Sequence, residues 1–343
     1  MKGLPENALD FVRKVLNLDE KVPLALEGIR PGGSDRTFFR CRTGDRTIVL
    51  MHYGLQRQEN ALYVDIGRFL KGIGIPVPEI LDHDPEGRFV LMEDLGEKDL
   101  WSLRDAPWNI RAALYRMTLD TAARLHAFPI IDFPSQVVRL MPAFCPELYR
   151  WERDYFREHF VQGVCSLSLE PVFASRLETE LQALAERIMQ MPPCLIHRDL
   201  QSQNVMVRGG ATVWIDFQGL RPGCSLYDVA SLLYDPYVSF SQEQRLQLLK
   251  HYAETTSQGL EWTEMVTPFR EAAVQRLLQA LGAFGFLGLR QGRRVFLFHI
   301  PRALDHLSET ASSNDDLSCL RELIERCLGA LAASPLILPP KSA

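Results

Sequence analysis

Two periods of hydrophobic positions follow one another along this chain, and the change lies near residue 95. Before it, short runs rich in β-branched and aromatic residues alternate with turn residues, which predicts strands joined by tight turns. The expected strands are Thr37–Arg42, Arg46–Tyr53, Ile80–Asp84 and Arg88–Glu93, and helical spacing is found at residues 6–18 and Gln58–Ile73. The order strand, strand, helix, strand, strand predicts a small antiparallel sheet with one helix.

From Gly96 onward the apolar positions recur every three or four residues, as they do in amphipathic helices. The expected helices are Ile110–Ala127, Pro146–Phe160, Glu178–Met189, Gln242–Thr255, Phe269–Leu289 and Asp316–Ala332. The sequence thus predicts an α+β protein with two parts, a sheet-rich lobe at residues 1–95 and a helical lobe at residues 96–343. A chain of 343 residues is long enough for one large unit or two smaller ones.

Composition and charge narrow the classes of partner. The net charge of −5 argues against a nucleic acid or an anionic membrane as the main partner. No run of 18 or more apolar residues is present, and the N-terminus lacks the apolar region of a signal peptide. The seven cysteines are scattered without a C-x-x-C pair, so disulfides and a zinc site are not expected. Together these observations favour a cytoplasmic protein; they do not indicate its oligomeric state.

One stretch, Leu195–Gly219, carries the candidate chemistry. It contains Asp199 within a His-Arg-Asp triplet, then Asn204 after four intervening residues, then an alternating strand that ends at Asp216. This is the H-R-D-x-x-x-x-N spacing of a phosphoryl-transfer loop, followed by a metal-binding aspartate. The reaction needs a carboxylate beside the attacking hydroxyl and two oxygen ligands for magnesium, because hard cations prefer carboxylate and amide oxygens. Each residue alone has an ordinary alternative as a helix cap, a turn residue or a strand end, but the combination favours a kinase.

These motifs resemble the protein-kinase-like superfamily, in its aminoglycoside phosphotransferase and choline kinase branch. The resemblance spans about residues 25–290 and implies a bilobal protein-kinase-like fold whose sheet-rich lobe covers ATP. It implies that Asp199 is the general base and that Asn204 and Asp216 hold magnesium. Three further residues would support the catalytic loop rather than react, namely His197, Arg198 and Asp228. For the last of these, simple capping of its own helix remains an alternative.

The resemblance also places the nucleotide. A glycine-rich stretch between Gly28 and Ser34 would lie over the phosphates, since missing side chains let backbone N–H groups approach an anion. The residues expected there are Gly32, Gly33 and Ser34. The segment L-M-E-D-L-G would form the hinge between lobes, and its backbone would hydrogen-bond adenine at Met92, Glu93 and Leu95. An ordinary hairpin turn and a plain connector are the respective alternatives.

One expected residue is missing. Protein kinases carry a lysine on the third strand, paired with a glutamate on the next helix, to hold the nucleotide phosphates. Here Met51 stands where the lysine is expected, while Glu59 remains as a pairing acid. Strand alternation favours Arg40 or Arg42 as the replacement cation over Arg36. Solvent-facing arginines and a catalytically weak pseudokinase both remain open as alternatives.

The acceptor is expected to be a small molecule. Asp216 and Asp228 are too close in sequence for the activation segment and A-P-E element that a peptide substrate needs. Candidate acceptor-binding residues are Asp235, which follows Asp228 by two helical turns, and Tyr155, in a run of aromatic and charged residues. A solvated helix end and a core aromatic are the alternatives for these two residues.

Within the branch, the chain looks most like bacterial kinases of cell-wall amino sugars, of the N-acetylmuramate and N-acetylglucosamine type. The shared motifs are G-S-D-R-T-F-F-R, L-M-E-D-L-G, I-D-F-Q and Y-D-x-x-S-L-L-x-D-P-Y, with the lysine-less strand T-I-V-L-M. The resemblance implies ATP- and magnesium-dependent phosphorylation of an amino sugar hydroxyl. An aminoglycoside or choline-type acceptor is the alternative within the same class.

Overall fold

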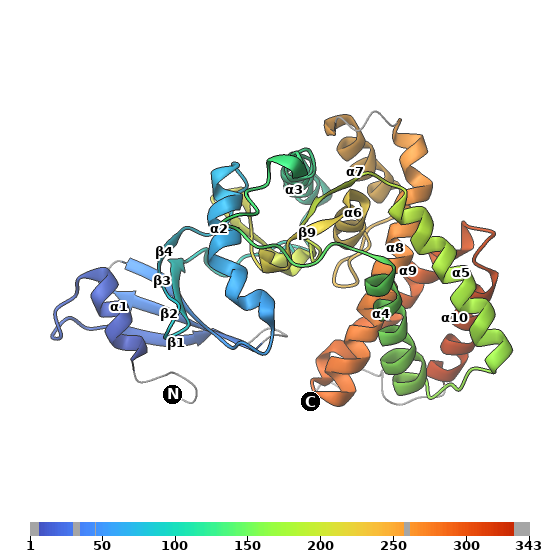
Figure 1. Ribbon diagram of the computed structural model, residues 1–343, viewed down its shortest axis with the longest axis horizontal. Helices are drawn as coiled ribbons and strands as arrows, with labels where there is room; N and C mark the ends of the chain where they lie inside the picture. The colour runs from blue at the N-terminus through green and yellow to red at the C-terminus, as the bar shows by residue number, and fades with distance from the viewer. Residues whose placement is uncertain (1–6, 30–34, 45, 257–260, 333–343) are drawn as a thin grey trace. The chain divides into compact units, whose positions relative to one another are not determined.

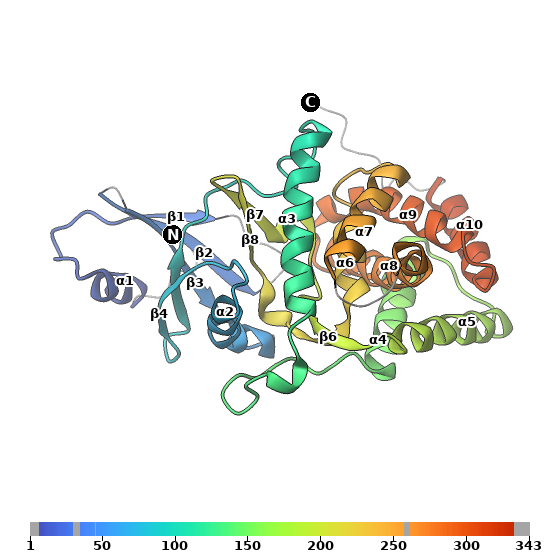
Figure 2. The ribbon, with the colours of Figure 1, turned by 90° about the horizontal axis from the view of Figure 1, so that it is seen from above.

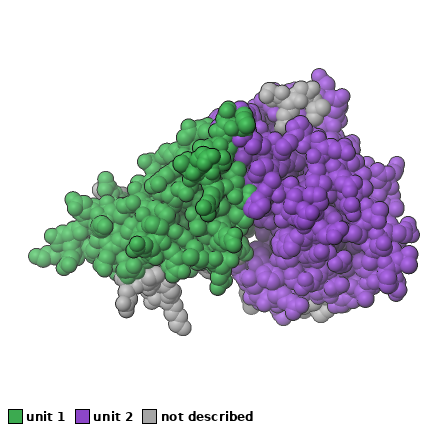
Figure 3. All heavy atoms as spheres, in the orientation of Figure 1, with its two compact units in different colours: residues 1–103, 131–141, 203–220 green, residues 104–130, 142–202, 221–343 purple. Residues whose placement is uncertain are grey.

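The computed structural model describes residues 7–29, 35–44, 46–256 and 261–332. The chain divides into two compact units (Figure 3). Unit 1 comprises Met1–Leu103, Ile131–Met141 and Gln203–Leu220, and unit 2 comprises Arg104–Ile130, Pro142–Ser202 and Arg221–Ala343. The predicted lobe boundary at residue 95 stays a prediction, since the compact units also group two later segments with the N-terminal residues.

Unit 1 is built on a five-stranded antiparallel sheet with the order β1-β2-β3-β5-β4 (Figure 1). Its strands are β1 (Ala25–Ile29), β2 (Arg36–Thr43), β3 (Arg46–Tyr53), β4 (Ile80–Asp84) and β5 (Phe89–Glu93). Four of these match the predicted strands. The fifth, β1, was not predicted, because this edge strand contains no buried residue and therefore shows no apolar alternation.

Helix α1 (Ala8–Leu16) closes one side of the sheet, where Ala8 and Val12 join a core with sheet residues such as Leu50 and Leu91. The predicted helix after β3 is a 3₁₀ turn (Gln58–Leu62) that continues into α2 (Tyr63–Gly72).

Unit 1 also contains a β-hairpin from the motif-bearing stretch, β7 (Val205–Arg208) with β8 (Ala211–Trp214), followed by a 3₁₀ turn (Phe217–Gly219). Helix α2 holds this turn. The ring of Phe217 stacks on Tyr63, with 4.6 Å between centroids, and a Cβ added at Gly67 would lie 3.1 Å from the Phe217 ring. Glycine at position 67 thus permits the close approach that positions Asp216.

Unit 2 is largely helical (Figures 1 and 2). Its helices are α3 (Trp108–His126), α4 (Pro146–Phe156) with a π-helical continuation (Arg157–Val164), α5 (Pro171–Met189), α6 (Ser225–Leu233), α7 (Gln242–Thr255), α8 (Trp262–Gly285) with a π-helical turn (Phe286–Arg290), α9 (Ile300–Ser312) and α10 (Ser318–Ala332). A short 3₁₀ segment of unit 2 lies at Arg294–His299, and two more, Ile130–Asp132 and Ser202–Asn204, lie where the chain passes from unit 2 to unit 1. Strands β6 (Pro193–Ile196) and β9 (Arg221–Cys224) pair antiparallel beside the catalytic loop.

Helix α8 is the central helix of unit 2 and packs against α4, α6 and α9 (Figure 2). A Cβ at Gly285 would lie 2.3 Å from the carbonyl oxygen of His159, so this glycine allows backbone contact with the π-helical segment. Among the described residues, Trp262–Arg290 alone is long and apolar enough to cross a membrane, by length and composition. In its most apolar window 78% is buried inside the protein, as in a core helix.

The predicted helices of unit 2 are confirmed, with differences at their ends and one omission. Helix α8 begins at Trp262 rather than at residue 269, because Pro268 lies inside the helix and does not end it. Helix α9 was not predicted, although Ala303, Leu304, Leu307 and Ala311 have helical spacing and are buried.

Candidate active site

The catalytic loop follows β6 in unit 2 and is held by a buried carboxylate. Arg198 has a left-handed backbone with φ of 79°, which is costly for a residue with a side chain. Asp228, in the first turn of α6 and fully buried, accepts the backbone N–H of His197 at 2.6 Å and of Arg198 at 2.8 Å. Both contacts stabilise the strained loop, and the supporting role of Asp228 in catalysis stays a prediction.

A second layer of contacts holds Asp228 itself. His126 Nε2 lies 3.3 Å from an Asp228 oxygen, and His126 Nδ1 lies 2.8 Å from the hydroxyl of Tyr252. The loop conformation therefore depends on α3 and α7 as well as on α6. His197 is only 1% exposed, which agrees with a supporting position.

Asp199 lies between two guanidinium groups. Arg198 Nη1 donates to Asp199 Oδ2 at 2.7 Å, and Arg276 Nη2 lies 3.4 Å from Asp199 Oδ1. Burial would raise the pKa of Asp199, but Arg198 and Arg276 together hold that pKa well below its usual range. The carboxylate is thus ionised at neutral pH and accepts hydrogen bonds, as a group that orients a hydroxyl must.

A buried acid on α4, which the sequence did not single out, lies behind the loop. Glu152 has no exposed surface; it accepts the Tyr227 hydroxyl at 3.0 Å and Gln275 Nε2 at 2.9 Å. Its carboxylate also lies 3.9 Å from Arg198 Nη2. Burial raises the pKa of Glu152, and the nearby Arg198 only partly opposes this.

Replacing Glu152 by leucine should lower the free energy of unfolding by about 2 kcal/mol or more, because two buried donors, on Tyr227 and Gln275, would lose their acceptor. Glu152→Gln keeps an acceptor oxygen and should cost less than about 1 kcal/mol. Chemical denaturation of both variants measures this difference, with Glu158→Leu, at an exposed site, as control. Equal stability of the two Glu152 variants would show that the carboxylate does not hold these donors.

Asp235 closes the other end of the loop. It accepts the backbone N–H of Ser202 at 2.7 Å and of Tyr237 at 2.9 Å, and it is 2% exposed. The alternative of a solvated helix end is therefore wrong. A direct contact with an acceptor is also disfavoured, because the carboxylate is buried and already bonded.

Tyr155 lies on α4 and is half-buried. Its ring stacks on Trp151, with 5.0 Å between centroids, and contacts His159 and Phe286. Trp151 is 49% exposed, so this aromatic pair is accessible to solvent. Acceptor binding at Tyr155 stays a prediction.

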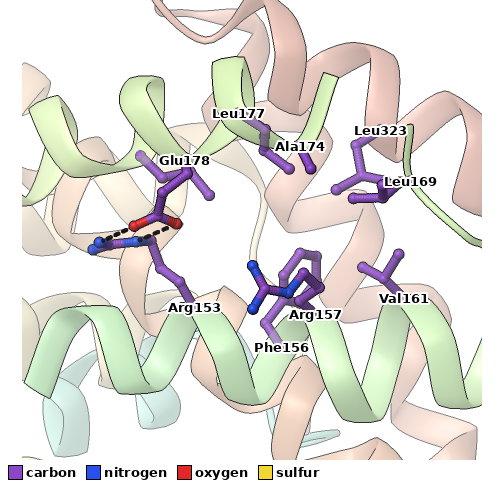
Figure 4. Close-up of a pocket in the computed structure, with 10 residues that line it drawn as sticks. Arg153, Phe156, Arg157, Val161, Leu169, Ala174, Leu177, Glu178 and Leu323 are labelled. Carbon is purple, nitrogen blue, oxygen red and sulfur yellow. Dashed lines mark hydrogen bonds and ion pairs between the residues drawn. The ribbon is translucent and has the colours of Figure 1, made fainter. Parts of the chain in front are cut away.

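A small cavity between α4, α5 and α10 is a less suitable place for an acceptor (Figure 4). Apolar side chains such as Phe156, Leu177 and Leu323 line most of it, and Arg153 at its edge bonds Glu178 at 2.7 Å. Its volume of about 20 Å³ has room for one or two water molecules. A sugar does not fit there.

The segments that carry the two candidate magnesium ligands lie side by side in unit 1. The hairpin of β7 and β8 begins directly after Asn204, and the N–H of Ile215 donates to the Asn204 carbonyl at 3.0 Å. Asp216 follows with a left-handed φ of 63°, and its carboxylate is 31% exposed. The structure therefore brings the neighbouring segments of both ligands side by side.

The donor chemistry of this pair fits magnesium. One carboxylate and one amide oxygen are the few protein ligands that magnesium takes when phosphates and water supply the rest. Among the described residues no group of three His, Cys, Asp or Glu could hold a metal, so the pair would depend on such phosphate oxygens.

Arg36 is the arginine that reaches Asp216. It forms an ion pair with the Asp216 carboxylate, and its Nη1 donates to Gln218 Oε1 at 2.7 Å. Gln218 Nε2 in turn donates to Asp216 Oδ1 at 2.9 Å. Burial would lower the pKa of Arg36, but the Asp216 carboxylate outweighs this effect and the pKa is raised.

The favoured replacement cations, Arg40 and Arg42, are engaged elsewhere. Arg40 bonds Asp94 at 2.8 Å and Glu97 at 2.7 Å, in the predicted hinge, and Arg42 pairs with Glu27 at 3.4 Å. These ion pairs weigh against Arg40 and Arg42, and the identity of the replacement cation stays a prediction. Arg40 shares a strand face with Arg36, but hinge carboxylates occupy its guanidinium.

The predicted pairing acid, Glu59, lies in the 3₁₀ turn before α2 and is 3.9 Å from Arg57 Nη1. It also contributes to the raised pKa of Arg36. The structure therefore associates Glu59 with Arg36 rather than with Arg40.

The structure describes the predicted hinge residues but not the predicted glycine-rich residues. Tyr63 donates to Met92 Sδ at 3.3 Å, the Glu93 N–H donates to the Glu79 carbonyl at 2.8 Å, and Leu95 is buried. Adenine binding by this backbone stays a prediction. Gly32, Gly33 and Ser34 lie outside the described residues.

The model of the phosphotransferase enzyme family (APH) matches residues 25–266. A curated relative from Pseudomonas aeruginosa, named N-acetylmuramate/N-acetylglucosamine kinase, is 28% identical over 302 residues, covering 86% of this chain and 87% of its own. A relative of the same name from Pseudomonas putida is 25% identical over 296 residues, covering 85% of each chain.

Two solved structures show the same fold. An ADP-bound aminoglycoside phosphotransferase, APH(2'')-Ib, superposes with a TM-score of 0.58 at 17% identity, covering 90% of this chain and 99% of its own. Choline kinase from Cryptosporidium parvum gives a TM-score of 0.59 at 17% identity, covering 96% and 97%. The predicted α+β kinase-like fold and the predicted class of small-molecule kinase are confirmed. This chain belongs to the phosphotransferase enzyme family.

Proposed function

We propose that this enzyme transfers the γ-phosphoryl group of ATP, with magnesium, to a hydroxyl of an amino sugar of the N-acetylglucosamine or N-acetylmuramate type. The observation that carries the proposal is Asp199, whose partly exposed carboxylate two arginines hold in the catalytic loop. The names of the curated relatives support the acceptor class. A cytoplasmic location is part of the proposal and agrees with seven free cysteines.

In the proposed reaction, Asp199 orients the acceptor hydroxyl and receives its proton, while the bond from the γ-phosphorus to the ADP oxygen breaks and the bond to the acceptor oxygen forms. Asn204 and Asp216 would hold magnesium, which would neutralise charge on the phosphate oxygens. Arg36, which pairs with Asp216 in this structure, would supply the cation that the missing lysine leaves absent once magnesium takes its place on that carboxylate.

Two other functions are weaker candidates. An aminoglycoside or a choline-type acceptor is suggested by the solved structures, but these share only the fold with this chain. A scaffold without catalysis is suggested by Met51, which is fully buried where a lysine would be expected. Against the scaffold, Asp199, Asn204 and Asp216 are all present, which a protein without catalysis would not need.

An acceptor screen tests the proposal. The purified enzyme, with ATP and magnesium, should release ADP with N-acetylglucosamine or N-acetylmuramate at least about tenfold faster than with choline or an aminoglycoside, a difference of roughly 1.4 kcal/mol. Phosphorus NMR of the product identifies the phosphorylated oxygen. Faster turnover of choline or an aminoglycoside would overturn the amino sugar assignment, and no turnover of any acceptor would favour the scaffold.

A further inference from the structure

Arg276 is held beside the proposed base from three directions. It lies on α8 and is 8% exposed. Its Nε donates to the Ser231 hydroxyl at 3.0 Å, its Nη1 donates to Gln279, and its Nη2 lies 3.4 Å from Asp199 Oδ1. A planar guanidinium bonded on each side cannot turn away without breaking these contacts, so its charge stays beside Asp199.

The position of this charge matters for the acceptor. An acceptor hydroxyl must lie within hydrogen-bond reach of the Asp199 carboxylate if that group is the base. Its oxygen would then be roughly 6 Å from the Arg276 guanidinium, a range over which charges in a partly buried site interact appreciably. A substituent next to that hydroxyl therefore meets a fixed positive charge.

The carboxylates near Asp199 do not neutralise the positive charge that Arg276 presents to the acceptor. Arg198, on the other oxygen of Asp199, adds a second guanidinium. Glu152 is fully buried and Asp235 is 2% exposed, with both oxygens of each already accepting hydrogen bonds. Asp199 is itself neutralised by two arginines, so an ammonium group on the acceptor finds no unpaired carboxylate among these residues.

We propose that Arg276 is both a positioning residue for Asp199 and a charge filter on the acceptor, admitting neutral or anionic amino sugars and rejecting those with a free ammonium group. This inference rests on the proposed function, because it takes Asp199 as the base. It goes further in assigning acceptor selectivity to a residue outside every kinase motif of the chain.

The test compares acceptors that differ in charge. N-acetylglucosamine is neutral, N-acetylmuramate is anionic, and glucosamine is a cation in buffer below pH about 7, where amines are protonated. The measured quantity is the ratio of kcat/KM between acceptors, for the wild-type enzyme, Arg276→Gln and Arg276→Lys. The lysine variant is the matched control, because it keeps the charge and loses the planar fork.

In Arg276→Gln the preference for N-acetylglucosamine over glucosamine should fall on the order of tenfold, and the preference for N-acetylmuramate over N-acetylglucosamine should fall too. Arg276→Lys should keep both ratios even if its kcat is lower. A general loss of structure would lower all three rates without changing the ratios. Calorimetric binding of the same sugars supplies the readout if a variant turns over too slowly.

Failure of the inference and failure of the proposed function give different results. If the wild-type enzyme phosphorylates the neutral sugars and Arg276→Gln leaves both ratios unchanged, the charge filter is wrong and the proposed function stands. If the wild-type enzyme prefers glucosamine, choline or an aminoglycoside over every neutral sugar, both are wrong.

Discussion

Asp199→Asn should lower kcat by 10²-fold or more, on the order of 10²–10⁴-fold for loss of a general base, while ATP still binds. The amide has nearly the same shape as the carboxylate but cannot accept the hydroxyl proton, and Arg198 and Arg276 lose their anionic partner. The residues expected to bind ATP belong to unit 1, whereas Asp199 belongs to unit 2. Turnover with saturating acceptor and calorimetric ATP binding measure the two effects separately.

The control is Asp105→Asn, which changes a highly exposed aspartate of the same unit and should leave kcat unchanged. Full turnover by Asp199→Asn, with an acceptor that the wild-type enzyme uses, would show that Asp199 is not the general base. The lowered pKa of Asp199 has a related consequence. Because this pKa is lowered, the Asp199 carboxylate is fully ionised from pH about 5 upward. A loss of rate between pH about 7 and 5 must therefore come from another group.

Asp216→Asn should have a comparably large effect, through magnesium rather than through the base. Metal ions supply several kcal/mol of charge stabilisation in such reactions, so a fall in kcat/KM on the order of 10³-fold is expected. Asparagine tolerates the left-handed backbone of this position, so the backbone is kept, while Arg36 loses its anionic partner. The direct measurement is ADP affinity as a function of magnesium concentration.

In the wild-type enzyme magnesium should strengthen ADP binding, and in Asp216→Asn this strengthening should be absent. Asp65→Asn, at an exposed position on α2, is the matched control in the same unit. An Asp216→Asn enzyme whose ADP affinity responds to magnesium as the wild type does would show that Asp216 is not a ligand.

The helices and strands that were predicted correctly are those whose pattern of buried and exposed residues is visible within a short stretch of sequence. Strand β8 and helices such as α7 each bury one face, so their apolar period is visible in sequence, while β2 and β3 are visible as runs of β-branched and aromatic residues between turns. Strand β1 has no buried residue and thus no such period. The boundary of α8 was misplaced because a proline normally marks a helix boundary, whereas Pro268 lies inside this helix.

The site was predictable only where its residues share one motif. Asp199, Asn204 and Asp216 follow from spacing within a single stretch. Arg276 and Glu152 do not, because they reach the loop through the packing of α8 and α4, which no local pattern records. Strand alternation grouped Arg40 with Arg42, but it could not show that β2 begins already at Arg36, nor that hinge carboxylates take Arg40 while Arg36 pairs with Asp216.

The glycine at position 285 has a consequence for how this enzyme can vary. It lies nine residues from Arg276 along α8, about 14 Å at 1.5 Å per residue. Because a Cβ there would collide with the His159 carbonyl, any larger residue displaces α8 from the π-helical segment after α4. Such a shift moves Arg276 relative to Asp199. With the proposed role of Arg276, the acceptor preference is open to mutations that touch neither acceptor nor nucleotide, and we expect variants with altered substrate range at this helix contact as well as at the catalytic loop.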